Sequence, residues 1–315
     1  MKRLFAGRGL YTAGLIALLV AGALAWSVAD AAAQGVTTSS ITGIVKDAQG
    51  LAVPGASIVA THEPSGTTYE TVAREDGRFS IQGMRVGGPY TVTATLSGFQ
   101  PQTVADVMLS LGVASDLTLT LGVAAVSEEV TVTGFNDPVF SSERTGSSTS
   151  VSQEALLSLP NLSNRINSFV RLAPESSGTS FSGQDNRLNN ITVDGSYFNN
   201  SFGLAGSPGD RTGVAPISVD AIEQIQVNIA PYDVRQGNFV GAGVNTVTKS
   251  GTNSLASSVY YQWRNDSMVG KTAGENSYDP GSFKYHNFGV WGGGPIVKNK
   301  LFFFFSFEDE ATTQP

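Results

Sequence analysis

The sequence predicts a mainly β chain in three parts: a β-sandwich, a small α+β unit and the first strands of a transmembrane β-barrel. Short apolar runs alternate with turn residues through residues 41–121, helical spacing occurs only after residue 151, and aromatic-rich alternation begins at residue 254. Charged residues make up 14% of the chain while glycine numbers 36, a composition that favours β structure over helical domains.

The first 33 residues have the pattern of a signal peptide. A basic start at Lys2 and Arg3 precedes an uncharged apolar stretch over residues 10–26, and small residues stand before Gln34. The alternative is a membrane anchor, but the small residues before Gln34 favour export with cleavage. No second apolar run reaches about 18 residues, so we expect any other membrane crossing to use strands.

Composition excludes several classes of site. The absence of cysteine removes disulfides, thiolate metal sites and an N-terminal lipid anchor. His62 and His286 lie in different segments, so we expect structural or surface roles and no metal. A net charge of -7 and a pI near 4.9 argue against a nucleic-acid partner. No catalytic arrangement of side chains emerges, so we expect no enzyme activity and no cofactor.

Residues 37–122 are predicted to form a β-sandwich of the immunoglobulin or transthyretin type. Seven or so short strands, separated by turns such as Asp76–Gly77, are typical of this architecture. The expected strands lie at residues 41–45, 57–60, 68–73, 78–81, 90–96, 103–107 and 116–121. Four aromatic residues would either stack on sugars or fill the core, and the core is the more common place. They are Tyr69, Phe79, Tyr90 and Phe99.

Residues 123–150 read as a linker rich in serine, threonine, glutamate and glycine. Within it lies one β-prone peptide: Glu129, Val130, Thr131, Val132 and Thr133. An alternating strand on a flexible linker can add to the edge of a partner's sheet through main-chain hydrogen bonds. The alternative is that it is only the last strand of the linker or the first of the next unit.

Residues 151–253 are predicted to form the α+β unit. Ser152 is a candidate N-cap for a first helix, and an apolar stripe after Pro160 predicts a second. The stripe consists of Leu162, Ile166, Phe169 and Val170. Strands are expected at residues 190–194, 221–227 and 242–249, with a polar excursion over residues 176–213.

Structural roles are expected for the glycine-containing motifs of this unit. Asp194–Gly195 predicts a tight turn after a strand, because glycine adopts backbone angles that other residues resist. Gly241 and Gly243, in the same run as Asn245, would let a strand closely approach either its neighbour or the barrel wall. No helix is readable after these glycines, which argues against a phosphate-binding loop.

Residues 254–315 are predicted to begin a transmembrane β-barrel. Leu255, Val259, Tyr261 and Trp263 fall on one face, and polar or amphipathic residues alternate with them. Further strands are expected at residues 285–291 and 301–308, with a turn at residues 292–295 between them. Residues 302–305 place two phenylalanines on each face, one pair toward lipid. Three strands cannot close a barrel, so we expect the protein to continue past Pro315.

Several motifs resemble those of the TonB-dependent outer-membrane receptors, in particular the Oar-like branch with an N-terminal carboxypeptidase-regulatory-like domain. They occupy residues 41–47, 53–56, 76–79, 90–99, 159–160, 191–195, 219–227, 241–253, 293–296 and 300–305. The resemblance implies that residues 151–253 form a plug, that residues 129–133 contact a TonB-type energy-coupling protein, and that the barrel lies in the outer membrane.

The resemblance also implies energy-coupled uptake of a large external ligand such as a peptide, an oligosaccharide or a metal chelate. Ligand contacts would come from the loops over residues 176–213 and from outer loops of the barrel. One alternative is an outer-membrane adhesin or secretion-linked receptor of the same architecture without active uptake. The other is a carbohydrate-binding surface protein, since the sandwich family shares a carbohydrate-binding-like fold.

Overall fold

The structure is a computed structural model that describes residues 36–123, 130–133, 147–158, 166–199, 217–231, 236–274 and 276–313. The expected signal peptide over residues 1–33 and the Leu159–Pro160 motif lie outside these ranges. The described part is mainly strand, which confirms the predicted fold class. Among the described residues, none of the helices has the length and apolarity needed to span a membrane.

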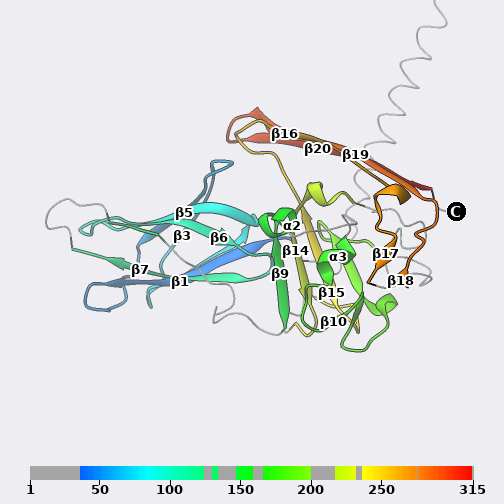
Figure 1. Ribbon diagram of the computed structural model, residues 1–315. Helices are drawn as coiled ribbons and strands as arrows, with labels where there is room; N and C mark the ends of the chain where they lie inside the picture. Colours follow the sequence, from blue (N-terminus) through cyan, green and yellow to red (C-terminus); the bar gives the residue numbers. More distant parts are fainter. Residues whose placement is uncertain are drawn as a thin grey trace, which may run out of the picture. The chain divides into compact units, whose positions relative to one another are not determined.

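All seven strands predicted for the sandwich are present. They are β1 (Ser39–Asp47), β2 (Ser57–His62), β3 (Thr67–Val72), β4 (Arg78–Met84), β5 (Gly87–Thr95), β6 (Gln102–Leu109) and β7 (Ala114–Leu121). Figure 1 labels β1, β3, β5, β6 and β7. One sheet has the order β4-β1-β7, and the other begins β3-β2-β5-β6. Side chains alternate between core and surface along these strands, as in β7, where every second residue is buried.

The second sheet of the sandwich contains a strand from the segment predicted as a linker. β8 (Val130–Thr133) pairs in parallel with residues 102–105 of β6 and forms the end of the sheet. The β-prone peptide is therefore part of the sandwich in this structure, where the sequence suggested a strand on a free linker.

The plug unit is a five-stranded sheet with two short helices. The sheet order is β13-β12-β15-β14-β9. Its strands are β9 (Ser148–Ser152), β12 (Asn190–Val193), β13 (Ser196–Tyr197), β14 (Ile222–Asn228) and β15 (Gly243–Thr248). The helices are α2 (Gln153–Ser158) and α3 (Ile166–Val170), whose buried faces join the sheet in one hydrophobic core. The Ser152 hydroxyl accepts a hydrogen bond from the Ala155 N–H at 3.4 Å, as expected of an N-cap.

The barrel sheet consists of three antiparallel strands in the order β16-β19-β20. They are β16 (Ala256–Asn265), β19 (Lys284–Val297) and β20 (Leu301–Thr313). The turn predicted at residues 292–295 is wrong, because β19 continues through these glycines and ends at Val297. Each glycine faces a phenylalanine of β20 across the ladder, and a Cβ on Gly292 would lie 2.8 Å from a ring carbon of Phe305. The glycines therefore make room for rings inside a strand.

Smaller elements complete the chain. β10 (Ser176–Ser177) and β11 (Ser180–Phe181) form one hairpin, and β17 (Thr272–Ala273) and β18 (Asn276–Ser277) form another. Single 3-10 turns occur at η1 (Asn186–Leu188), η2 (Val219–Ala221) and η3 (Asp266–Met268).

Candidate functional site

The plug turn at Asp194–Gly195 joins β12 to β13. Both residues have positive φ, 48° and 81°, which is the combination that a tight hairpin requires. The Asp194 carboxylate also accepts hydrogen bonds from the backbone N–H of Thr248 at 2.9 Å and from its hydroxyl at 2.7 Å. The turn is thus attached to the end of β15.

The two motif glycines of β15 and its preceding loop lie against side chains. A Cβ on Gly241 would overlap the amide of Asn189, and one on Gly243 would lie 2.8 Å from the Phe239 ring. The Asn189 side chain in turn accepts a hydrogen bond from the Ala242 N–H at 3.0 Å. The close approach predicted for these glycines is present, but the neighbours are side chains and not a second strand.

Asn245, the third motif residue, belongs to a chain of buried and half-buried amides in the plug. Its Oδ1 accepts a hydrogen bond from the Thr192 hydroxyl at 2.7 Å, and its Nδ2 lies 3.5 Å from Gln236 Oε1. Gln236 Oε1 also accepts from Asn228 Nδ2 at 2.6 Å, and Asn228 Nδ2 reaches Gln226 Oε1 at 2.8 Å. Buried polar groups need such partners, so these side chains fix one arrangement of the sheet.

The amide chain continues into the sandwich. Gln226 Nε2 donates to the Leu111 carbonyl at 2.5 Å, and Gln224 Oε1 accepts from the Leu111 N–H at 2.6 Å. Leu111 is fully buried and clusters with Val36 and Val86 of the sandwich, with Val247 of the plug packed against them. Two glutamines of β14 therefore hold both polar groups of one residue in the turn between β6 and β7, and we call this contact the glutamine clamp.

Charged side chains gather beside the clamp. Burial raises the pKa of Asp220 and of Glu223, while nearby Lys249 lowers both pKa values. Burial lowers the pKa of Lys249, and the two carboxylates oppose that change. The ammonium group of Lys249 lies 4.7 Å from the centre of the Trp291 ring, a cation–π distance. Arg85 and Glu223 also line a cavity of about 260 Å³ at the sandwich–plug boundary.

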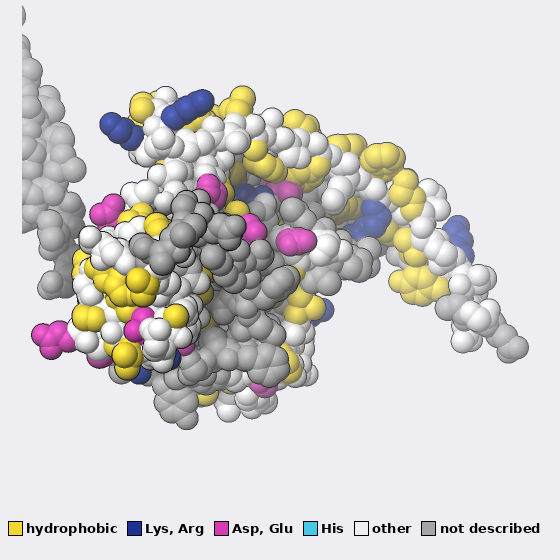
Figure 2. All heavy atoms as spheres, turned by 90° about the vertical axis from the view of Figure 1, so that its left-hand side faces the viewer, with side chains coloured by type: hydrophobic (Ala, Val, Ile, Leu, Met, Phe, Trp, Pro, Cys, Tyr) yellow, Lys and Arg dark blue, Asp and Glu magenta, His cyan; other side chains and the backbone are white. Residues whose placement is uncertain are grey.

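The barrel sheet has two different faces. The face turned to the plug carries Tyr260, whose hydroxyl lies 3.2 Å from the Ser218 hydroxyl and also bonds to Glu308. The other face is apolar and exposed. The sheet lies at the top of Figure 1, and hydrophobic side chains, in yellow, follow the top of the view in Figure 2. The exposed residues include Val259, Tyr261, Trp263, Phe303, Phe305 and Phe307. This is the alternation predicted for β16 and for the phenylalanine run.

The peptide predicted to contact a TonB-type protein lies at one end of the sandwich sheet. The backbone of Val130, Thr131, Val132 and Thr133 pairs with β6, whereas Glu129 lies outside the described residues. β8 has a partner strand on one side only among the described strands, since it ends the sheet. The peptide is thus in the extended conformation that strand addition requires.

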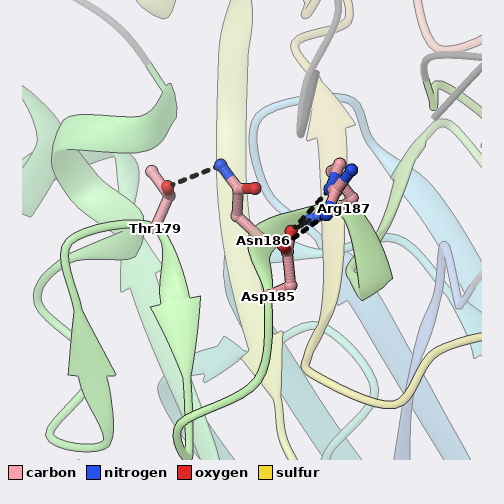
Figure 3. Close-up of polar contacts among 4 residues, drawn as sticks. All are labelled: Thr179, Asp185, Asn186 and Arg187. Carbon is pink, nitrogen blue, oxygen red and sulfur yellow. Dashed lines mark hydrogen bonds and ion pairs between the residues drawn. The ribbon is translucent and has the colours of Figure 1, made fainter. Parts of the chain in front are cut away.

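Part of the predicted ligand loop is ordered by polar contacts (Figure 3). The Arg187 guanidinium donates to both carboxylate oxygens of Asp185, at 3.0 and 2.7 Å, and Asn186 donates to the Thr179 hydroxyl at 3.2 Å. Hydrogen bonds from the side chain and backbone of Arg187 lower the pKa of Asp185 to about 2. This exposed ion pair shapes η1, while residues 200–216 of the loop lie outside the described residues.

The remaining candidates have structural positions. His62 is buried and bonds to the Ser65 hydroxyl at 2.6 Å, whereas His286 is exposed on β19. Within the described ranges, no group of three or more potential metal ligands occurs. Phe79 and Tyr90 belong to the sandwich core, and Tyr69 and Phe99 pack against it. The core interpretation of these four aromatics is therefore the one that the structure supports.

Sequence reasoning missed the glutamine clamp and the Lys249–Trp291 contact. The available signal was the run Ile222-Glu-Gln-Ile-Gln-Val, in which two glutamines interrupt a buried strand. A buried strand with amides at positions 224 and 226 needs partners for them. Their partners are backbone groups more than 110 residues away, so no local pattern identifies them.

Two family models match the chain. The carboxypeptidase regulatory-like domain matches residues 40–122, which form the sandwich. The outer membrane beta barrel domain matches residues 247–315, which include the whole barrel sheet. The chain is thus part of an outer-membrane protein.

Comparison with known proteins gives relatives of the same kind. The chain is 26% identical over 295 residues to the TonB-dependent transporter Oar of Myxococcus xanthus, an alignment that covers 87% of this chain. The alignment covers 27% of that relative, so the chain spans about a quarter of its length. The siderophore receptor PirA from Acinetobacter baumannii is 22% identical with a TM-score of 0.40, over 52% of this chain and 24% of that one. Its counterpart from Pseudomonas aeruginosa is 20% identical with a TM-score of 0.37, over 54% and 28%. The chain, with its regulatory-like sandwich and its barrel strands, therefore resembles the TonB-dependent outer-membrane receptors of the Oar-like branch over most of its length.

Proposed function

We propose that the chain is part of an outer-membrane transporter that takes up a large ligand by energy-coupled transport. In this proposal the plug unit blocks the barrel, ligand binds from outside, and a TonB-type periplasmic protein engages residues 129–133. The similarity to a TonB-dependent transporter supports the proposal. We propose no catalytic role for any residue of the chain.

The observation that carries the proposal is the two-faced barrel sheet. Its apolar face is exposed, with Val259 and Trp263 each more than 60% exposed, as a lipid-facing surface requires. Its other face contacts the plug through Tyr260 and Trp291. A folded unit against the inner wall of a barrel fills a lumen, and such a lumen conducts a ligand only when that unit moves.

The coupling strand offers the means to move it. β8 precedes the plug in the chain, and the first plug strand, β9, lies at the edge of the plug sheet and pairs with its neighbour β14 over five residue pairs. A pull on residues 129–133 therefore reaches the plug sheet through the connecting segment. External ligands of the size of a peptide, an oligosaccharide or a metal chelate would meet the loops over residues 176–213.

The test is uptake in cells that carry the complete gene. Labelled peptides, oligosaccharides and metal chelates would be offered with the proton gradient intact and after its collapse by a protonophore. We expect uptake of one class that stops on collapse, and that stops equally when residues 128–134 are deleted. Deletion of the seven residues 137–143 is the control, because it shortens the same segment and leaves the strand intact. Binding that persists without any gradient-dependent uptake would contradict the proposal and favour an adhesin.

A further inference from the structure

The strand that coupling needs is already occupied on one side. Val130–Thr133 forms four parallel residue pairs with Gln102, Thr103, Val104 and Ala105 of β6. We propose that this edge of β6 is a docking surface that holds the coupling strand, and that the TonB-type partner must take the strand from it. The inference rests on the proposed function, because it concerns the same peptide.

The docking surface is short and has a defined end. The β2–β3 and β2–β5 pairings of this sheet each comprise six residue pairs, compared with four between β6 and β8. Asp106 follows the last paired residue with a φ of 59°, so β6 leaves the extended conformation at that point. Parallel pairing is also slightly weaker per residue than antiparallel pairing. A four-residue parallel strand at a sheet edge is therefore suited to release.

A force that the partner applies to β8 reaches different parts of the molecule when β8 is docked on β6 and when it is released. β6 runs from its contact with β8 to Leu109, and the next turn contains Leu111, which the glutamine clamp attaches to β14. A pull on docked β8 is thus carried by the sandwich and by the clamp. A pull on released β8 passes along residues 134–147 to β9. Docking therefore separates the partner's pull from the segment that leads directly into the plug.

A disulfide across the pairing tests the proposal. The sequence contains no cysteine, so Thr103→Cys with Thr131→Cys creates a single defined pair at matched register positions. Thr103 is partly exposed and its neighbour Val104 is buried in the core, so the substitution leaves the core unchanged. Thr61→Cys with Thr68→Cys is the control, because it locks β2 to β3 at a matched pair in the same sheet.

The measurement uses the full-length receptor in detergent and the periplasmic domain of the same bacterium's TonB-type protein as the probe. We expect the oxidised 103–131 pair to bind the probe at least tenfold more weakly than its reduced form. Reduction should restore binding, and the 61–68 pair should bind equally in both forms. Deletion of residues 128–134 should abolish binding.

Three results would overturn the inference. Failure of the 103–131 disulfide to form would show that the strand does not dock on β6. Equal binding by the oxidised and reduced forms, with loss of binding on deletion, would show that the partner uses the other edge of β8. The proposed coupling role of residues 129–133 would then stand, but release of β8 from β6 would not be required. Unchanged binding after deletion of residues 128–134 would contradict both the coupling role of this peptide and the proposed role of its docking on β6.

Discussion

Single amide side chains connect the plug with the sandwich. Gln226 has partners on both sides, the Leu111 carbonyl and Asn228, and is almost completely buried. Asn228 also donates to Gln236, but removing the Gln226 side chain takes its partner from the buried Leu111 carbonyl. An unpaired buried acceptor costs more than the hydrogen bond itself contributes.

Gln226→Ala should therefore lower the local stability of the clamp by about 1–3 kcal/mol. Hydrogen–deuterium exchange of peptides that cover β14 and the Leu111 turn would measure the change as faster exchange. Gln82→Ala is the matched control, because Gln82 is an exposed strand residue. Equal exchange in the two variants would show that the clamp contributes little.

His62 should make the sandwich sensitive to acid. Burial lowers its pKa from 6.5 to about 4, with Arg85 acting in the same direction and Glu63 opposing. The unfolded chain thus binds a proton at higher pH than the folded chain, and stability falls as the pH drops from about 6.5 toward 4. The loss should be on the order of 2–3 kcal/mol.

Unfolding midpoints in urea between pH 7 and pH 4 would measure this dependence. His62→Gln should remove most of the slope between pH 6.5 and 4, whereas His286→Gln should leave it unchanged, since His286 is exposed. A His62→Gln variant with the wild-type slope would assign the acid sensitivity to other groups.

Among the secondary-structure elements, the hairpin from β12 to β13 depends on its two-residue turn. Gly195→Ala should destabilise the plug by about 1–2 kcal/mol, because a side chain is strained at a φ of 81°. Gly237→Ala is the control, since its added Cβ has no atom within 4 Å and its φ lies outside the strained range. Thermal unfolding of both variants would show the difference, and equal midpoints would contradict it.

Elements were predictable from the sequence where the pattern is local. The sandwich strands and the two faces of β16 follow from alternation, and Ser152 marked the start of α2. The turn expected at residues 292–295 failed because glycine and proline usually mark turns, whereas here Gly292 and Gly294 face phenylalanine rings of β20. That requirement comes from a neighbouring strand, which the local sequence does not show.

The same distinction applies to the candidate site. Asp194 and Gly195 form the turn that their residue types predicted, because a two-residue turn is a local structure. The docking of Val130–Thr133 on β6 was not predictable, because a short Val-Thr strand can pair with any exposed edge. Gln224 and Gln226 were visible as polar residues in a buried strand, but their partner Leu111 was not.

At the scale of the whole molecule, Lys249 connects the plug with the barrel wall. It balances the partly buried Asp220 and Glu223 and lies over Trp291. Lys249→Met removes the charge that lowers the pKa of both carboxyl groups, so these pKa values should rise further above their unfolded values. A carboxyl group whose pKa is raised in the folded protein lowers the free energy of unfolding as the pH rises above its pKa in the unfolded chain. The reason is that the folded protein must then ionise the group where it is poorly solvated.

Lys249→Met should therefore destabilise the plug by about 1–2 kcal/mol, and more at pH 7 than at pH 5. Thermal unfolding of the full-length receptor in detergent at the two pH values would measure it. Lys249→Arg keeps the charge and the cation–π contact and should show a smaller loss with little pH dependence. A Met variant that loses the same stability at both pH values would show that packing, and not charge, is responsible.

The glutamine clamp has a consequence for how such receptors diverge. Gln224 and Gln226 bind the main chain of residue 111 and not its side chain, so the contact places little demand on which apolar residue stands there. At position 111, any apolar residue that fits the cluster with Val36 and Val86 would be tolerated as long as the backbone keeps its course. A substitution at either glutamine would remove a hydrogen bond between the plug and the sandwich. Selection for contact between sandwich and plug should therefore act mainly on β14, which carries both glutamines. A sandwich exchanged between related receptors should still form the same two hydrogen bonds with β14.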